Sequence, residues 1–402
     1  MTTLTEPPTQ QDVAAEWLAL DPDAKCVCAQ CGLAFPVQGI GGPGLICPRC
    51  GFCPGKQSCR YIMDALAERR AKGEIAAAAE PVEVVPSAAP PGLADVIGNA
   101  SAVAQIRTAL EAHRARAAAG SKAAFPHIFF VGPAGSGKST LAAIVARECK
   151  HKLHEHLGQS LNDPRAMVAA LLKLKAGDIL YIDELHGLKR TCTETLYTAL
   201  EGRQVSPISS RGNTPLPPVK LPPFTLIGAT TDEYKLTDSF KQRFQYHIHL
   251  KRLTPGELAS AIGQRAERLG IKLEPAAAQM IAERSHGTPR KAVMLLNRCA
   301  DAALAGKTDV IDGFVVKGAC DMAELDSLGL TAAERVYLQV LGAAIKPTRL
   351  NVLASTLSVP PRVVEIEIER DLIYLSLIEK RPDGRVISDA GRRHLRALGG
   401  AA

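Results

Sequence analysis

Residues 132–140, Gly-Pro-Ala-Gly-Ser-Gly-Lys-Ser-Thr, constrain the fold of this chain more than any other stretch. They fit the phosphate-binding pattern G-x-x-x-x-G-K-[ST]. The apolar run 127–131 predicts a buried strand before the loop, and the alanine-rich run 141–148 predicts a helix after it. A glycine-rich turn that matches by chance is the alternative. The order strand, loop, helix favours a nucleotide-binding P-loop in an α/β domain with a parallel sheet.

The residue types of this loop suit the phosphates of ATP. Glycines let backbone N–H groups turn inward around phosphate oxygens, and the N-terminus of the next helix adds partial positive charge. A lysine supplies the cation, and the hydroxyl beside it is a ligand for Mg²⁺. The residues predicted to bind ATP and Mg²⁺ here are Gly132, Gly135, Gly137, Lys138, Ser139 and Thr140.

A second nucleotide signature follows at residues 178–184, Asp-Ile-Leu-Tyr-Ile-Asp-Glu. Here an apolar strand ends in two acids, at the edge where parallel sheets bind ligands. We expect Asp183 to hold Mg²⁺ through water and Glu184 to polarise the attacking water. The alternative is a buried strand followed by an acidic helix cap. A third strand, 224–231, ends at Thr231, which would contact the γ-phosphate or that water.

A cysteine cluster near the N-terminus predicts a metal module. Seven of the 11 cysteines lie between Cys26 and Cys59, and in a reducing compartment such a cluster favours metal over disulfides. Two C-x2-C knuckles 15 residues apart fit a closed tetrahedral zinc site without a catalytic position. An iron–sulfur cluster and no metal are the alternatives, because Cys26, Cys53 and Cys59 are spare. The predicted zinc ligands are Cys28, Cys31, Cys47 and Cys50.

Bulk properties set the class of protein. At 402 residues, 46% hydrophobic and 22% charged, the chain can bury the cores of about two to four domains. No stretch has the length and hydrophobicity of a membrane span, and residues 1–20 lack the apolar core of a signal peptide. We therefore expect a cytoplasmic, nucleoid-associated protein without a membrane partner. The net charge of +7 modestly favours an anionic partner.

Residues 328–398 predict a winged helix. Helices are expected at 331–344, 351–358 and 362–374, followed by two short strands around the turn 381–384, Arg-Pro-Asp-Gly. The wing bases Lys380, Arg381 and Arg385 suit DNA phosphates. A protein-docking module of the same fold is the alternative. Before this domain, residues 254–318 are expected to be helical throughout.

Taken in order, residues 92–398 resemble the bacterial RuvB family, the AAA+ motors of Holliday-junction branch migration. The likeness covers about three quarters of the chain. It includes 127–133 (His-Ile-Phe-Phe-Val-Gly-Pro), 183–186 (Asp-Glu-Leu-His), 223–231 (Pro-Phe-Thr-Leu-Ile-Gly-Ala-Thr-Thr) and 287–290 (Gly-Thr-Pro-Arg).

The resemblance implies roles for several residues. Thr231 corresponds to sensor 1, Arg243 to the arginine finger and Arg290 to sensor 2, and Ile97 lies in a segment that helps wall the adenine. A surface arginine is the alternative for Arg243, and a helix-capping arginine for Arg290. The resemblance also implies a homo-hexamer on duplex or four-way-junction DNA, with a RuvA-like junction-binding partner. The domains expected are a tail (1–25), a zinc-ribbon-like module (26–59), a helix and linker (60–91), the AAA+ large ATPase domain (92–253), its helical lid (254–325) and the winged helix (326–402).

Four features depart from the family pattern. The metal module is an addition, with an unknown partner. In the segment 203–222, where RuvA docks in the family, residues 206–212 are mostly polar where the family is apolar, and Pro215, Pro217 and Pro218 disfavour strand pairing. Leu253 stands where the family has a tyrosine near the adenine, and Asp383 occupies a wing tip that is basic in the family. We therefore expect an ATP-driven motor on branched DNA in recombination and repair. The alternative is an ATP-switched DNA-binding or loading platform that recruits a partner through its ribbon.

Overall fold

The computed structural model describes residues 25–27, 34–36, 91–121, 123–207 and 217–399. The chain divides into two compact units, 1–86 and 87–402, each considered by itself. In the first unit, β1 (Lys25–Val27) pairs antiparallel with β2 (Ala34–Pro36). The predicted zinc ligands and the expected helix and linker at 60–91 lie outside the described residues, except for Pro91. Among the described helices, none is long and apolar enough to cross a bilayer.

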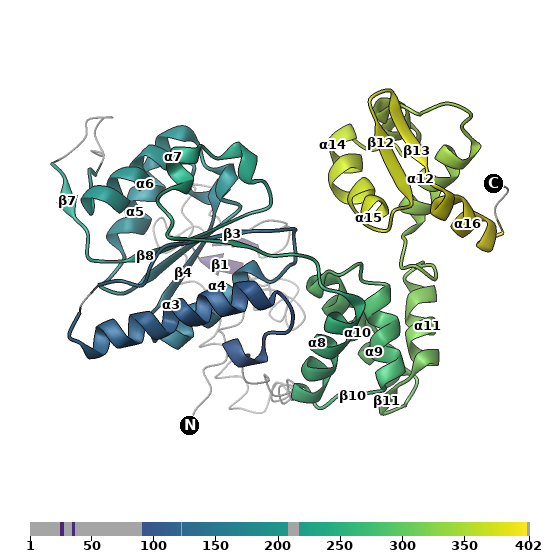
Figure 1. Ribbon diagram of the computed structural model, residues 1–402, viewed down its shortest axis with the longest axis horizontal. Helices are drawn as coiled ribbons and strands as arrows, with labels where there is room; N and C mark the ends of the chain where they lie inside the picture. Colours follow the sequence, from purple (N-terminus) through teal and green to yellow (C-terminus); the bar gives the residue numbers. More distant parts are fainter. Residues whose placement is uncertain (1–24, 28–33, 37–90, 122, 208–216, 400–402) are drawn as a thin grey trace. The chain divides into compact units, whose positions relative to one another are not determined.

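A five-stranded parallel sheet forms the centre of the large domain in the second unit (Figure 1). Each central strand is buried on both faces, which explains its unbroken apolar sequence. The sheet confirms the predicted α/β P-loop fold. Across the sheet the strands are β4 (Leu153–Leu157), β5 (Ile179–Asp183), β8 (Thr225–Thr230), β3 (Ile128–Val131) and β9 (Tyr246–His249).

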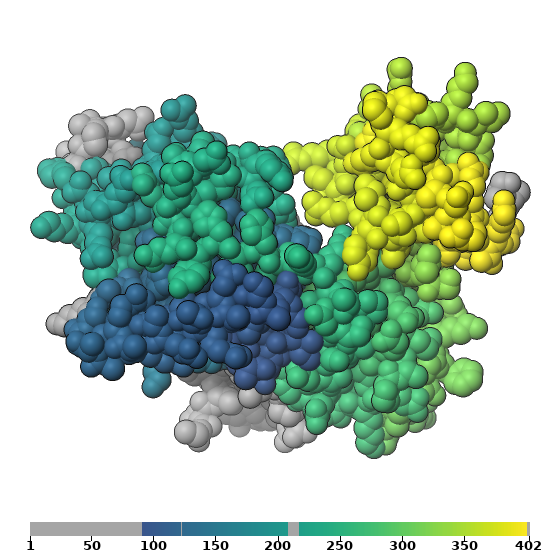
Figure 2. Space-filling view, in the orientation of Figure 1, coloured from purple at the N-terminus to yellow at the C-terminus, as the bar shows by residue number. Residues whose placement is uncertain are grey.

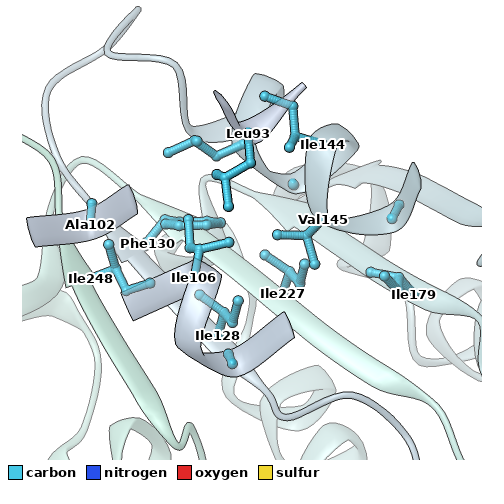
Figure 3. Close-up of a cluster of buried hydrophobic side chains, with 14 of the residues drawn as sticks. Leu93, Ala102, Ile106, Ile128, Phe130, Ile144, Val145, Ile179, Ile227 and Ile248 are labelled. Carbon is cyan, nitrogen blue, oxygen red and sulfur yellow. The ribbon is translucent and has the colours of Figure 1, made fainter. Parts of the chain in front are cut away.

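Helices cover both faces of this sheet. One face packs against α3 (Ala100–Ala118) and α4 (Lys138–Cys149), through the cluster drawn in Figure 3. The opposite face packs against α5 (Pro164–Leu172), α6 (Arg190–Gly202) and α7 (Asp238–Lys241). Alternate residues of β3 contribute to the two clusters, as period-two side chains must. Single turns of 3-10 helix complete the domain at Leu93–Asp95, Gly158–Leu161, Leu185–Gly187 and Glu233–Lys235.

A short hairpin interrupts the large domain in the segment expected to resist strand pairing. β6 (Gln204–Val205) and β7 (Val219–Lys220) pair antiparallel, so that expectation is wrong for the two ends of the segment. The prolines at 217 and 218 precede β7, where no ladder hydrogen bond is lost. Residues 208–216 lie outside the described residues.

The lid is a bundle of four helices, α8 (Pro255–Arg268), α9 (Pro275–Glu283), α10 (Pro289–Ala305) and α11 (Gly313–Met322). The first begins with a capping box, in which Thr254 and Glu257 satisfy each other's backbone N–H groups. The expectation of helix throughout 254–318 is wrong at β10 (Lys272–Leu273) and β11 (Val310–Ile311). These two-residue strands pair in parallel. They link the loop between α8 and α9 to the loop between α10 and α11.

The C-terminal domain has the predicted winged-helix order, with one additional helix. It comprises α12 (Ala332–Ala343), α13 (Leu350–Thr356), the third helical segment 361–374, and the wing strands β12 (Ile378–Arg381) and β13 (Gly384–Ile387). The third segment is α14 (Pro361–Val363), a π-helical stretch (Val364–Ile368) and α15 (Glu369–Tyr374). The unexpected helix, α16 (Asp389–Ala397), begins at a Ser388 cap and packs on the domain core.

Candidate active site

The P-loop joins the carboxyl end of β3 to the N-terminus of α4. Gly135 and Gly137 have φ of +73° and +96°, a region in which only glycine is unstrained. A Cβ on Gly132 would lie 2.7 Å from the carbonyl oxygen of Leu250. Each of these three glycines is thus required by backbone geometry, and Ser139 and Thr140 follow on the exposed first turn of α4.

Lys138 is the buried cation of this loop, with 6% of its surface exposed. Its ammonium group donates to the carbonyl oxygens of Gly132 (2.9 Å) and Pro133 (3.0 Å). Burial lowers its pKa, while Glu184 and Asp183 oppose that shift. Because burial disfavours the charged ammonium group, an anionic ligand beside it would stabilise that charge in place of the lost hydration.

The loop also contains a buried donor without a partner. Ser136 Oγ has no hydrogen-bond partner among the described residues, although buried polar groups are almost always paired. Ser136 Oγ lies beside Gly132, because a Cβ on Gly132 would come within 3.2 Å of this oxygen. A free hydroxyl, a lysine and turned-in backbone together fit a bound phosphate group.

Two acids follow at the carboxyl end of β5, as predicted. Asp183 accepts the backbone N–H of Glu184 at 3.0 Å. Glu184 has a left-handed φ of +48°, which turns its side chain towards the end of β8. There its Oε2 accepts hydrogen bonds from the Thr231 hydroxyl (3.0 Å) and N–H (3.3 Å). The structure therefore brings Asp183, Glu184 and Thr231 together.

His186 is a site residue to which sequence reasoning assigned no role. Its Nδ1 lies 3.1 Å from Glu184 Oε2 and 2.9 Å from Thr230 Oγ1. The imidazole therefore contacts the same carboxylate oxygen as Thr231. Its position two residues after Glu184 in the sequence could have indicated that it lies at this site.

The start of α10 reaches the P-loop. The backbone N–H of Arg290 donates to Gly135 O at 3.3 Å, and a Cβ on Gly135 would lie 2.7 Å from Arg290 Cβ. On another side, Gly98, beside Ile97, lies so close to Leu253 that a Cβ there would come within 2.4 Å of its side chain. Leu253 thus contacts the segment expected to wall the adenine.

Arg243 lies away from these groups within the chain. Its guanidinium pairs with Glu201 at the end of α6 and stacks 5.5 Å from the centre of the Tyr197 ring. It borders a cavity of about 320 Å³ that is also lined by Arg116 and Arg203. The P-loop does not line this cavity.

The wing bases are paired with acids of their own domain. Arg385, with 15% of its side chain exposed, donates from Nε to Glu369 Oε1 at 2.8 Å. Lys380 lies 2.6 Å from Glu369 Oε2, and Arg381 pairs with Glu379 at 3.0 Å. Figure 2 shows the wing in yellow at the surface of the face in view. Arg385 therefore has a structural contact, while Lys380 and Arg381 are more exposed.

The predicted zinc ligands cannot be placed, because all four lie outside the described residues. Cys28 and Cys31 fall in the sequence between the paired strands β1 and β2. Within the described part of the chain, no group of three or more metal-ligating side chains is found.

Comparisons with known proteins identify the family. Sequence models named Holliday junction DNA helicase RuvB P-loop domain, RuvB AAA lid domain and RuvB C-terminal winged helix domain match residues 88–250, 253–326 and 327–396. A Paramagnetospirillum magneticum protein named Holliday junction branch migration complex subunit RuvB is 34% identical over 309 residues, covering 76% of this chain and 88% of the relative. The chain belongs to the RuvB family. Its P-loop domain makes it an ATP hydrolase.

Two further relatives agree with this assignment. A Prochlorococcus marinus protein of the same name is 36% identical, over 70% of this chain and 81% of its own length. The solved structure named Thermotoga maritima RuvB Holliday junction branch migration motor has a TM-score of 0.67 and 31% identity. It is matched over 78% of this chain and 99% of its own. RuvB-family likeness thus spans all three domains of the second unit.

Proposed function

We propose that this protein is an ATP-driven motor that moves branched DNA, such as Holliday junctions, in recombination and repair in the cytoplasm at the nucleoid. The observation that carries the proposal is the pair of hydrogen bonds from Thr231 to the Glu184 carboxylate. They lie in a chain that has a complete P-loop and all three RuvB-type domains. An ATP-binding switch without turnover needs no carboxylate fixed at this edge of the sheet.

We assign each site residue a task from its position. Lys138, Ser136 and the loop N–H groups bind phosphate oxygens, and Ser139 with Asp183 would hold Mg²⁺. The bound nucleotide and metal supply the phosphoryl group and neutralise its charge. Glu184 orients and polarises water, with its carboxylate fixed by the Thr231 hydroxyl.

The remaining groups act at the edges of the site. Thr231 and Arg290 would contact the γ-phosphate and so respond to its presence or absence. Ile97 would pack against the adenine. Arg243 acts on a neighbouring subunit, because within its own chain it pairs with Glu201. This assignment requires an oligomer, and we propose a hexameric ring with a RuvA-like partner at the junction.

The N-terminal unit would add targeting. We propose that Cys28, Cys31, Cys47 and Cys50 bind one structural Zn²⁺, because the antiparallel pair β1–β2 flanks the first knuckle. Elemental analysis of natively purified protein should then give about one zinc per chain, and iron with sulfide would refute it. Deleting residues 1–91 should leave basal ATPase intact and remove preference for the natural DNA or partner.

The decisive experiment measures ATPase and four-way-junction unwinding with purified protein, with and without a RuvA-type partner. We expect ATPase stimulated by DNA and ATP-dependent unwinding, both lost in Lys138→Ala. ATP binding with slow, DNA-insensitive hydrolysis and no unwinding would favour the loading platform instead. Arg190→Ala, which removes an exposed cation of α6 outside the P-loop, is the control and should behave as the parent.

A further inference from the structure

A buried carboxylate of the winged-helix domain contacts the segment that carries Arg290. Asp371 lies in α15, and its side chain is 8% exposed. Its Oδ1 accepts Arg252 Nη1 at 2.7 Å. Its Oδ2 pairs with Lys291 Nζ and lies 3.3 Å from His286 Nδ1. We call Asp371, Arg252, His286 and Lys291 the Asp371 cluster.

This cluster fixes the loop before α10 from two sides. Arg252 Nη1 also donates to the backbone oxygen of His286 at 2.8 Å, and its guanidinium stacks 4.4 Å from the centre of the Tyr374 ring. Gly287, at a φ of +67°, leaves no room for a Cβ, which would lie 2.9 Å from Tyr374 Oη. The winged-helix segment therefore packs directly on residues 286–287.

Three residues separate His286 from Arg290, which contacts the P-loop. The chain runs from His286 through Gly287, Thr288 and Pro289 to Arg290, whose N–H donates to Gly135 O. α15 is also within electrostatic range of the P-loop, because Arg370 helps to lower the pKa of Lys138, after burial and together with Arg290. A shift of α15 would therefore act on both the loop and the charge at the phosphate site.

The charges of the cluster make the carboxylate necessary. Burial opposes ionisation of Asp371, but the close contact with His286 and the hydrogen bonds from Lys291 and Arg252 outweigh it, so its pKa lies below the usual range. Without this carboxylate, the mostly buried Arg252 guanidinium would lose its counter-charge, and Lys291 would lose its partner on α15. Removing one partner of a buried ion pair is strongly destabilising, so the loop would be held to α15 less firmly.

We propose that Asp371 is a positioning residue through which the winged-helix domain sets the Arg290 segment, and so couples DNA binding to ATP binding. Asp371 contacts Arg252, His286 and Lys291, and would act on the nucleotide site through them. DNA that restrains α15 would restrain the segment that contacts Gly135. By linkage, ATP would change DNA affinity by the same factor that DNA changes ATP affinity. The proposal rests on the role given to Arg290 above.

The test measures the affinity of a fluorescent ATP analogue for full-length protein, with and without saturating duplex DNA. We expect DNA to change the Kd of the parent by roughly 5-fold or more, the usual range for coupled sites. In Asp371→Asn, DNA should change the Kd of the analogue by less than about 2-fold. Asp371→Glu should restore part of the effect of DNA. Asp301→Asn, exposed on α10, is the matched control and should behave as the parent.

A purely structural role would lower stability without changing the coupling factor. If Asp371→Asn fails to fold, the exposed Lys291→Gln removes one contact of the same carboxylate and should also reduce coupling. Coupling in a folded variant within about 2-fold of the parent's, or none in the parent, would overturn the proposal. Arg290→Ala distinguishes a failure of the role proposed for Arg290 from a failure of the role proposed for Asp371. If it leaves ATP binding and turnover unchanged, the role of Arg290 fails; if it impairs them while Asp371→Asn keeps full coupling, only the role of Asp371 fails.

Discussion

At the scale of single residues, Glu184 is the group whose surroundings assign it a task. Its strained backbone and two hydrogen bonds from Thr231 fix the carboxylate at the carboxyl edge of the sheet. Glu184→Gln keeps the shape but no longer polarises water. We expect its turnover to fall by at least roughly 10²-fold, as when a positioned base is lost. ATP affinity should stay within a few-fold, measured by ATPase assay and analogue titration.

The control for this change is Glu194→Gln, an exposed acid on α6 that pairs with Arg190. It should match the parent in both assays. Equal turnover by Glu184→Gln and the parent would show that another group polarises the water. His186, 3.1 Å from the same oxygen, would be the first residue to examine.

Much of this site could be predicted from sequence, because its residues lie directly after apolar strands. Glu184 and Thr231 are 47 positions apart, yet both end parallel strands that share one edge. The Asp371 cluster could not be predicted this way. Its members come from a loop, a helix start and a domain 119 positions beyond Arg252, and no periodicity connects them.

At the scale of elements, the wing is held by a buried acid. Glu369 has no exposed side-chain surface and accepts from Arg385, Lys380 and the Tyr337 hydroxyl. Burial opposes its ionisation, and these hydrogen bonds outweigh that effect, so its pKa is lowered from 4.5. The stabilisation it provides is therefore present above about pH 4.5 and is lost as pH falls through its folded-state pKa.

Glu369→Gln should therefore destabilise the winged helix at neutral pH, by roughly 3 kcal/mol, because Arg385 loses its buried counter-charge and keeps only the more exposed Glu365. The difference from the parent should shrink as pH falls below 4.5. Calorimetry of the full protein between pH 7 and pH 3 measures this. Glu379→Gln, which removes an exposed acid, is the control and should give a small, nearly pH-independent change. A constant difference for Glu369→Gln would contradict the assignment.

The same pairing sets the DNA contact expected of the wing. Arg385 is mostly buried against Glu369, whereas Lys380 and Arg381, which also pair with acids, are about half exposed and are the bases expected to contact phosphates. Asp383 lies at the turn between the strands. For about two phosphates, log K should fall with log salt at a slope near −1.8. Asp383→Arg should tighten duplex binding and steepen the slope by about 0.9, measured by fluorescence anisotropy. Asp301→Arg, on the lid, adds the same charge elsewhere, and an equal effect would mean that the wing tip does not face DNA.

Element boundaries show where sequence patterns were sufficient. The three buried runs predicted as strands, 127–131, 178–184 and 224–231, lie close to β3, β5 and β8. The edge strands β4 and β9 were not predicted. β10 and β11 were missed because two-residue strands have no periodicity to detect. The pairing of β6 with β7 was missed because the prolines were expected to disfavour it, whereas they precede the paired residues.

At the scale of the whole molecule, the position of Arg243 has a consequence for assembly. Within one chain this arginine pairs with Glu201 and stacks on Tyr197, and the P-loop does not line the cavity beside it. An isolated chain therefore contains the phosphate-binding and water-polarising groups, but its Arg243 is engaged elsewhere. If Arg243 serves catalysis, it does so on a neighbouring subunit, and ring closure would then supply every site with one such arginine.

Mixing two inactive variants tests this arrangement. Arg243→Ala should lower turnover by roughly 10³-fold or more, as loss of a trans arginine finger does, and leave ATP affinity nearly unchanged. Lys138→Ala should lose ATP binding. In mixed assemblies, an intact P-loop from an Arg243→Ala subunit can meet an intact Arg243 from a Lys138→Ala subunit. ATPase should therefore reappear on mixing, with a maximum near equal proportions. Arg190→Ala mixed with Lys138→Ala should show only the activity of the Arg190→Ala fraction, without such a maximum. If mixed assemblies form, as native mass spectrometry would reveal, and no activity returns, then Arg243 does not act across a subunit interface.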